Sequence, residues 1–303
     1  MKERPALPPV RAFRFLGSRF PQVSTVADAR VRSLASPSMP AMRIATWNVN
    51  SIRQRLDHLA RFAAEYAPDV ICMQETKVED EHFPVEAVKK LGYRFHVIHG
   101  QKNYNGVAIL SRLPFTAPEP RIWCEKDDCR HVQMLLPGYV ELHNFYVPSG
   151  GPDADVEKNP KFKHKLQFLA EMADWAGRDQ LWKRKVLLVG DLNVAPLEND
   201  VWNHKRLVRS VGHTPGESAA MKLLWDQGRL VDVPRHFTPE PQQLYSWWGY
   251  RFPQSYEKDY GWRLDHMLAS PKLMPHVKRL ETVRLTRTWD RPSDHVPIVI
   301  DLD

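Results

Sequence analysis

With 303 residues, 43% of them hydrophobic, the chain can form one large globular domain or two small ones. It lacks an apolar run long enough to cross a bilayer, and its arginine-containing first forty residues lack the apolar stretch of a signal peptide. Most of the net charge of +7 lies in residues 1–41, which hold seven basic and two acidic residues. Residues 42–303 hold 36 basic and 34 acidic residues, so charge alone identifies no nucleic-acid surface on this part of the chain.

Residues 1–41 are rich in Pro, Arg, Ser and Ala and show no clear period, so we expect a disordered extension. Met39 and Met42 stand just before the first predicted strand, and a start site assigned too far upstream is a second interpretation. A transit peptide is a third, which the prolines disfavour. Residues 42–303 contain no linker, and we expect them to form a single domain.

Apolar residues at helical spacing predict two long helices in this domain. The residues are Ile52, Leu56, Leu59, Ala63 and Tyr66 in the first helix, and Phe162, Leu166, Leu169, Ala173 and Ala176 in the second. Residues 217–227 predict a shorter helix that ends at Gly228, because glycine commonly follows the last turn of a helix.

Short runs rich in Val and Ile predict strands between and after these helices. The runs are 43–48, 70–75, 93–99, 106–111, 131–136, 139–147, 186–191, 245–250, 264–269, 282–288 and 296–302. So many strands exceed one small sheet, and we predict two packed sheets with helices on the outside.

Several of these strands end at a carboxylate or a carboxamide, and two others begin beside a carboxylate or a histidine. The polar residues are Asn48, Glu75, Asp191 with Asn193, Asp265, and Asp294 with His295. If the strands share a sheet, their ends deliver oxygen ligands and one imidazole to a common edge, as in a site for a hard metal ion. A hard cation beside a carboxylate base and a histidine is suited to phosphodiester hydrolysis.

The spacing of Asp191 and Asn193 adds a geometric expectation. They stand two residues apart after a buried strand, and in extended backbone such residues point the same way. We therefore expect both side chains to face one substrate phosphate.

The three cysteines of the chain, Cys72, Cys124 and Cys129, form no Cys-x-x-Cys pair. An odd count is typical of a protein of the reducing cytosol, and we expect a cytoplasmic protein of bacterial type. Cys124 and Cys129 could form a bridge, but two free thiols in a surface loop are the simpler interpretation.

Eight ordered sequence blocks carry a family resemblance. They are TWNVNSIRQRL (46–56), CMQETK (72–77), YNGVAILS (104–111), FYVPSGG (145–151), VGDLNVAP (189–196), YSWWGYR (245–251), GWRLDHMLAS (261–270) and RPSDHVPIVI (291–300). Together they resemble the exonuclease III family of the endonuclease/exonuclease/phosphatase superfamily. The resemblance implies a four-layer α/β sandwich, with two packed mixed β-sheets flanked by helices, and a metal-dependent DNA repair nuclease.

The resemblance also implies roles for individual residues, beside the ordinary alternatives of strand-end, turn and core residues. Residues expected in catalysis are Tyr146, Asp191, Asn193, Asp265 and His295. Residues expected around the metal are Asn48, Glu75, Asp191, Asn193, Asp294 and His295. Residues expected to bind DNA are Arg53, Lys77, Ser149, Trp247, Trp262 and Leu264.

Within this set, the family assigns Asp191 to the activation of water and Asn193 to transition-state stabilisation, which the chemistry supports. We expect Asp265 to orient His295, and Asn48 either to donate an oxygen to the metal or to orient the base. Tyr146 is expected to contact phosphate.

Three positions depart from the family pattern. Ser149 stands where many members have Asn, Gly249 replaces a common acidic residue, and Asp259 stands where we expect Asn. The last two lie in the loop that shapes an aromatic pocket, which in relatives receives a flipped-out abasic sugar. The sequence therefore leaves the lesion preference open.

We expect hydrolysis of the phosphodiester 5′ to abasic sites in duplex DNA, with 3′→5′ exonuclease or 3′-phosphatase activity. Mg²⁺ is the expected cofactor, with Mn²⁺ as the alternative, and duplex DNA with abasic sites or 3′ ends is the expected partner of a monomer that binds no membrane. Two alternatives are a phosphoesterase acting on RNA or small phosphoesters and a non-catalytic DNA-binding module. The aromatic block at 245–264 argues against the first, and the intact catalytic set argues against the second.

Overall fold

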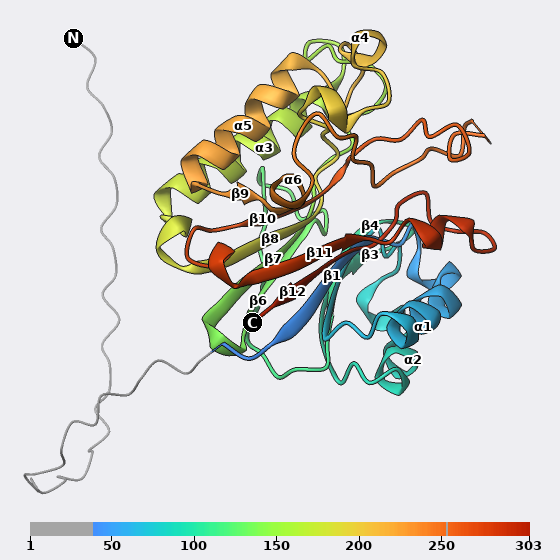
Figure 1. Cartoon of the computed structure of the whole chain (residues 1–303), viewed down its shortest axis with the longest axis vertical. Coiled ribbons are helices and arrows are strands. Elements are labelled where there is room, and N and C mark those ends of the chain that lie inside the picture. Colours follow the sequence, from blue (N-terminus) through green and yellow to red (C-terminus); the bar gives the residue numbers. More distant parts are fainter. Residues whose placement is uncertain (1–38, 253) are drawn as a thin grey trace, which may run out of the picture. The chain divides into compact units, whose positions relative to one another are not determined.

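A computed structural model describes residues 39–252 and 254–303. The disordered extension expected at 1–41 therefore lies outside the described residues, apart from 39–41. In the described part, strands form two six-stranded sheets with helices on their outer sides (Figure 1). The predicted arrangement of two packed mixed sheets flanked by helices is confirmed.

The first sheet has the strand order β11-β12-β1-β2-β4-β3. Its strands are β1 (Met42–Asn48), β2 (Val70–Gln74), β3 (Phe95–Gln101), β4 (Tyr104–Ser111), β11 (Val277–Thr282) and β12 (Ile298–Leu302). Within it, β1 and β2 pair in parallel and the other neighbours are antiparallel. The parallel register places Asn48 opposite Gln74, so both strands end at the same edge of the sheet.

The second sheet has the order β5-β6-β7-β8-β10-β9. Its strands are β5 (Thr116–Pro120), β6 (His131–Leu136), β7 (Val140–Tyr146), β8 (Lys185–Asp191), β9 (Val231–Asp232) and β10 (Asp265–Ala269). Here β7 and β8 are the parallel pair. Their register places Tyr146 opposite Asp191, and Asp191 lies opposite Asp265 on antiparallel β10.

The helices cover the outer face of each sheet (Figure 1). On the first sheet these are α1 (Leu56–Glu65) and α2 (Val85–Lys90), and on the second they are α3 (Pro160–Arg178) and α5 (Pro215–Gly228). Two short helices, α4 (His204–Leu207) and α6 (Val233–Phe237), lie in connections. Proline at the first helical position marks the start of α3 and of α5, where its missing N–H costs no hydrogen bond.

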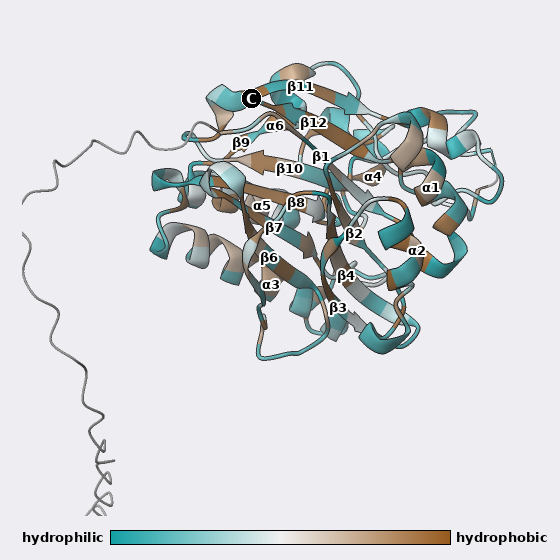
Figure 2. Cartoon of the chain, turned by 90° about the horizontal axis from the view of Figure 1, so that it is seen from below, coloured by the Kyte–Doolittle hydropathy of each residue, from teal (hydrophilic) through white to brown (hydrophobic). Residues whose placement is uncertain are grey.

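The core has three hydrophobic layers, and successive residues of a strand belong to different layers. Ile44 packs between the sheets and Ala45 against the helices of the first sheet, while Leu187 and Leu188 divide in the same way in the second. This follows from the two-residue period of a strand, with both faces buried. Figure 2 shows the hydrophobic residues gathered on the strands and polar residues on the outer turns of the helices.

Two predicted strands are wrong. Residues 245–250 form a loop in which Trp247 makes only isolated bridges to Trp262 and His295. In the 282–288 segment, β11 ends at Thr282 because its partner β12 begins there, opposite Ile298, and residues 284–288 form a 3-10 helix. Strands β5 and β9 were not predicted: β5 contains two prolines and is exposed, and β9 has two residues.

Candidate active site

Five strand ends from both sheets bring polar residues together at one edge of the domain. The residues are Asn48 at the end of β1, Glu75 after β2, Tyr146 at the end of β7, Asp191 at the end of β8 and Asp265 at the start of β10. His295 lies in the loop that precedes β12. Parallel strands leave a sheet on the same side, which is why residues so far apart in sequence meet here.

Asn48 joins the two sheets at this edge. Its Nδ2 donates to Glu75 Oε1 at 2.9 Å and to Asp191 Oδ2 at 2.8 Å. Its Oδ1 accepts the backbone N–H of Asn50 at 3.0 Å. Asn48 is therefore placed to orient two carboxylates, and its own oxygen is already engaged.

Glu75 is held by three side chains. Besides Asn48, the Tyr146 hydroxyl donates to Oε1 at 2.9 Å, and Lys77 Nζ lies 2.7 Å from Oε2. Burial alone would raise the pKa of Glu75, but Lys77 and Asn48 outweigh it and hold the pKa below its ordinary value. Burial and the charges of Glu75 and Asp191 raise the pKa of Tyr146 well above its ordinary value, so the phenol remains a hydrogen-bond donor.

Asp191, His295 and Asp265 form a buried carboxylate–imidazole–carboxylate series. His295 Nδ1 lies 2.7 Å from Asp265 Oδ2, and its Nε2 lies 3.7 Å from Asp191 Oδ2. Burial would lower the pKa of His295, but the two carboxylates raise it to about 10. Burial raises the pKa of Asp191 to about 7, with Asp265 and Glu75 adding to the effect of burial and His295 opposing it.

Ligand atoms of Glu75, Asp191 and His295 lie within 4.8 Å of one another. A protonated His295 has no free lone pair, so the two carboxylates are the residues of this group that could hold a metal ion. A hard divalent cation prefers oxygen ligands and retains several waters, so two carboxylates are sufficient protein oxygens. Asp294 is not brought to this group: its oxygens accept from Asn50 Nδ2 and Trp247 Nε1, both at 2.9 Å. The donor set therefore fits the expected cofactor with fewer protein ligands than the six we predicted.

The expected extended backbone between Asp191 and Asn193 is wrong. Asn193 has a φ of 54°, in the left-handed region that asparagine tolerates better than most residues. Its backbone N–H returns to Asp191 Oδ1 at 2.9 Å, and its Nδ2 donates to the Val147 carbonyl at 2.9 Å. A turn, rather than the two-residue period of a strand, sets the direction of its side chain.

An aromatic wall stands beside His295. The rings of Trp247 and Trp262 meet at right angles with centroids 6.2 Å apart, and the Trp247 ring lies 6.5 Å from that of His295. Both indoles pack against the small buried cluster that contains Leu264, and both remain partly exposed. Trp248, in contrast, is fully buried on the other side of the loop. The structure thus separates the pocket residues from the core residue in the aromatic block.

Two of the three departures from the family pattern have local explanations. Asp259 accepts from Trp248 Nε1 at 3.0 Å and from Arg284 at 2.6 Å, so the carboxylate gains an ion pair. A side chain at Gly249 would meet the Trp247 ring at 2.7 Å, so glycine leaves room for that indole. Ser149 is exposed, and its carbonyl accepts from Lys165 Nζ at 3.3 Å.

Of the two basic residues predicted to bind DNA, Lys77 lies inside the site and Arg53 lies beside it. Lys77 Nζ contacts Glu75 and also donates to Asn50 Oδ1 at 2.6 Å. Arg53 is exposed and shares with Lys77 and Lys102 a surface hollow of about 250 Å³. Cations on this side of the carboxylates are suited to contact the phosphates of a nucleic-acid strand.

Sequence reasoning missed two residues that support the site. Arg130 lies with its guanidinium 5.0 Å from the centre of the Tyr146 ring and donates to the Tyr146 carbonyl at 3.2 Å. Ser293 Oγ donates to the Asn48 carbonyl at 2.7 Å. Ser293 lies in one of the family blocks and could have been found there, whereas Arg130 lies in none of them.

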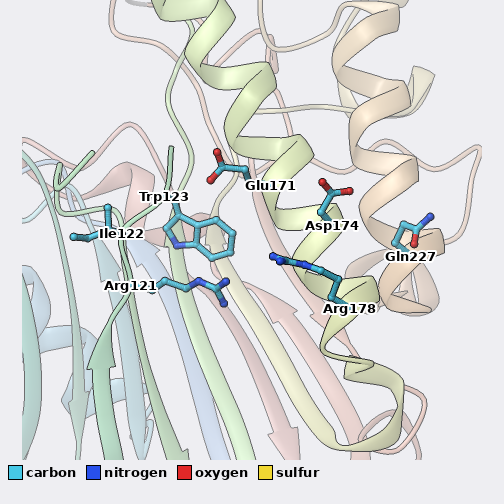
Figure 3. Close-up of a pocket in the computed structure, with 7 residues that line it drawn as sticks. All are labelled: Arg121, Ile122, Trp123, Glu171, Asp174, Arg178 and Gln227. Atoms are coloured by element: carbon cyan, nitrogen blue, oxygen red, sulfur yellow. The ribbon is translucent and has the colours of Figure 1, made fainter. Parts of the chain in front are cut away.

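A second hollow, of about 450 Å³, lies between α3 and the loop that follows β5 (Figure 3). Its lining residues are Arg121, Ile122, Trp123, Glu171, Asp174, Arg178 and Gln227. None of them belongs to the candidate active site. Among the described residues, no helix is both long and apolar enough to span a membrane.

Comparison with known proteins places this geometry in a family. The model of the Endonuclease/Exonuclease/phosphatase family matches residues 45–295. The exodeoxyribonuclease III of Haemophilus influenzae is 32% identical over 274 residues, which cover 85% of this chain and 98% of that protein.

Solved structures agree. An AP endonuclease from Archaeoglobus fulgidus is similar with a TM-score of 0.80 at 33% identity, covering 86% of this chain and 99% of its own. A 3′ phosphatase from Neisseria, bound to a product DNA hairpin, has the same TM-score at 32% identity, with the same two coverages. The chain therefore belongs to the Endonuclease/Exonuclease/phosphatase family, in the group of exodeoxyribonuclease III and the AP endonucleases.

Proposed function

We propose that this nuclease hydrolyses the phosphodiester 5′ to abasic sites in duplex DNA and also removes nucleotides or phosphate from 3′ ends. The observation that carries the proposal is the meeting of Glu75, Asp191 and the His295–Asp265 pair at one edge, beside the wall of Trp247 and Trp262. Carboxylates and a charged imidazole serve phosphoryl chemistry, and an aromatic wall accepts a sugar that has left the base stack.

Each residue has a separate role in the proposed hydrolysis. Asp191, held by Asn48 and by the backbone of Asn193, takes the proton of the attacking water. His295, fixed and kept cationic by Asp265, donates to a phosphate oxygen as charge develops on it. The second N–H of the Asn193 amide adds a further donor. Tyr146, whose hydroxyl donates to Glu75, holds that carboxylate in place.

We propose Mg²⁺ as the cofactor, held by Glu75 and Asp191 with waters in the remaining positions, and Mn²⁺ as a substitute. When bound, the ion would neutralise phosphate charge and stabilise the leaving oxygen. We also propose that the protein acts as a monomer. The unbridged Cys72, Cys124 and Cys129 support a reducing, cytoplasmic location.

The test is cleavage of a duplex that carries one tetrahydrofuran abasic analogue, with Mg²⁺ and with EDTA. We expect a single cut on the 5′ side of the analogue, abolished by EDTA, and little cutting of an intact duplex of the same sequence. A 3′-phosphorylated duplex measures the second activity in parallel. Turnover of RNA or an inositol phosphate but not of the abasic duplex would favour the phosphoesterase alternative. Tight binding without turnover would favour the non-catalytic module.

A further inference from the structure

Helix α3 carries a buried cation that faces the loops of the candidate site. Lys165 is fully buried in the middle of an otherwise amphipathic helix, and its Nζ pairs with Glu217 Oε1 of α5, which is also fully buried. Burying two charges is costly, and a pair of apolar side chains would usually stabilise the same space as well or better. The presence of this pair therefore requires a reason other than the stability of the α3–α5 contact.

The contacts of Lys165 point to the loop after β8. Its ammonium donates to the Asn193 carbonyl at 2.6 Å and to the Ser149 carbonyl at 3.3 Å, in addition to Glu217. A lysine has three N–H donors, and here each has an acceptor. Asn193 is thus fixed at its N–H by Asp191, at its side chain by Val147 and at its carbonyl by Lys165.

The contacts of Glu217 point to the pocket wall. Its carboxylate accepts the Gly212 N–H at 2.9 Å and both the N–H and the hydroxyl of Thr214 at 3.1 and 2.7 Å. The Gly212 carbonyl in turn accepts from Ala195 at 2.7 Å, and Gly212 lies against the Trp262 ring. The other end of the same ion pair therefore fixes the turn that supports the aromatic wall.

We propose that Lys165 and Glu217 are positioning residues, which hold Asn193 and the Trp262 wall at a fixed separation. This inference rests on the proposed function, because it assumes that Asn193 acts at the phosphate and that Trp262 receives the sugar. Lys165 sets the turn of Asn193, on which the rate of the chemical step depends. Glu217 sets the 212–214 turn, on which substrate binding depends. A displacement of about 1 Å at a reacting group can reduce a rate about a hundredfold.

The experiment compares Lys165→Met, the double variant Lys165→Met/Glu217→Gln and wild type on the tetrahydrofuran duplex. The single variant leaves a buried carboxylate without its cation, so we expect it to lose thermal stability. In the double variant both charges are gone, but the Asn193 and Ser149 carbonyls lose a donor, so we expect a smaller loss of stability than in the single variant rather than none. The amide oxygen introduced at position 217 still accepts from Gly212, so we expect a duplex Kd near that of wild type. Its single-turnover rate should nevertheless fall about ten- to a hundredfold, because the Asn193 carbonyl has lost its anchor.

A control removes a partly exposed ion pair near the start of β1, at the end of the strand away from Asn48, with Arg43→Met/Asp301→Asn, whose partners lie 2.6 Å apart. We expect its single-turnover rate to be unchanged. A folded double variant with a single-turnover rate within about twofold of wild type would overturn the proposal. A double variant that does not fold would also overturn it, by showing that the pair serves the fold itself. Wild type alone tests the proposed function, which fails if wild type does not cleave the abasic duplex. The variants test only the positioning role.

Discussion

At the residue scale, hydrogen bonds within the protein hold the side chains of the candidate site in place. Asp191 receives Asn48 Nδ2 on one oxygen and the Asn193 N–H on the other, which fixes the carboxylate without neutralising it. Without a bound cation, burial raises its pKa to about 7, so the carboxylate is more basic than that of an exposed aspartate. The environment of one side chain thus combines orientation with basicity.

Asp191→Asn should abolish turnover and leave duplex binding nearly unchanged, because an amide keeps the shape of the carboxylate but cannot take a proton from water. The expected loss in the single-turnover rate is more than about a thousandfold. Binding to the tetrahydrofuran duplex provides the control for folding. Activity within about tenfold of wild type would remove Asp191 from the role of base.

Glu75→Ala should raise the Mg²⁺ concentration needed for half-maximal activity, because one carboxylate ligand is removed. Metal titrations of wild type and variant at a fixed DNA concentration measure this shift. Glu86→Ala, which removes an exposed carboxylate of α2 that belongs to none of the candidate metal groups, is the control. A titration curve that superimposes on that of wild type would count against Glu75 as a ligand.

His266 should make the fold sensitive to acid. It is fully buried, its Nε2 donates to the Val194 carbonyl at 2.7 Å, and burial with nearby Arg263 lowers its pKa from 6.5 to about 4. The unfolded chain therefore binds this proton more readily, so the contribution of His266 is present above pH 6.5 and is lost as the pH falls below it. At about pH 5 the loss amounts to about 2 kcal/mol of unfolding free energy.

Urea unfolding of wild type and His266→Gln at about pH 7.5 and pH 5 measures this effect. The variant should lose about 2 kcal/mol less than wild type between the two pH values, whatever its stability at the higher one. His82→Gln, at an exposed histidine, should behave as wild type does. Equal acid losses in wild type and His266→Gln would exclude this histidine as the cause.

At the scale of elements, the sequence predicted those segments whose periodicity is decided locally. The helix predicted from the apolar residues between Phe162 and Ala176 and the helix predicted over 217–227 are confirmed as α3 and α5. The strand predicted at 245–250 is wrong because the aromatic residues of this segment line a pocket and the core instead of pairing with a neighbouring strand. The end of β11 could not be predicted, since it is set by where β12 begins, more than ten residues later.

Gly190→Ala should disrupt the pairing of β7 and β8. Gly190 has a φ of 136°, and an added Cβ would lie 1.9 Å from the Phe145 carbonyl oxygen of the neighbouring strand. Strain and overlap together should lower the unfolding free energy by about 3 kcal/mol or more. Gly216→Ala is the control, since no atom of the described residues lies within 4 Å of its added Cβ, and it should be neutral or slightly stabilising. A variant at Gly190 as stable as wild type would contradict the clash.

At the scale of the whole molecule, the site exists only when both sheets are assembled. Asn48 of the first sheet donates to Asp191 of the second, and His295, which precedes β12 of the first sheet, pairs with Asp265 on β10 of the second at 2.7 Å. The strand-end residues could be found in the sequence, because a sheet collects its strand ends at one edge. The hydrogen bonds of Lys165 and Arg130 could not, because they depend on which segments distant in sequence become neighbours in the fold.

Removing residues 1–38 should leave the single-turnover rate at saturating DNA unchanged. The boundary follows from Met39, which packs in the core between the sheets and must be retained. The removed segment carries seven basic and two acidic residues and none of the proposed site residues. Its excess of positive charge should add nonspecific DNA affinity through counterion release, so the full chain should bind an undamaged duplex more tightly at low salt and equally at high salt. Binding of both forms across a salt series measures this difference, and a truncated protein that is insoluble or inactive would show that the segment belongs to the catalytic domain.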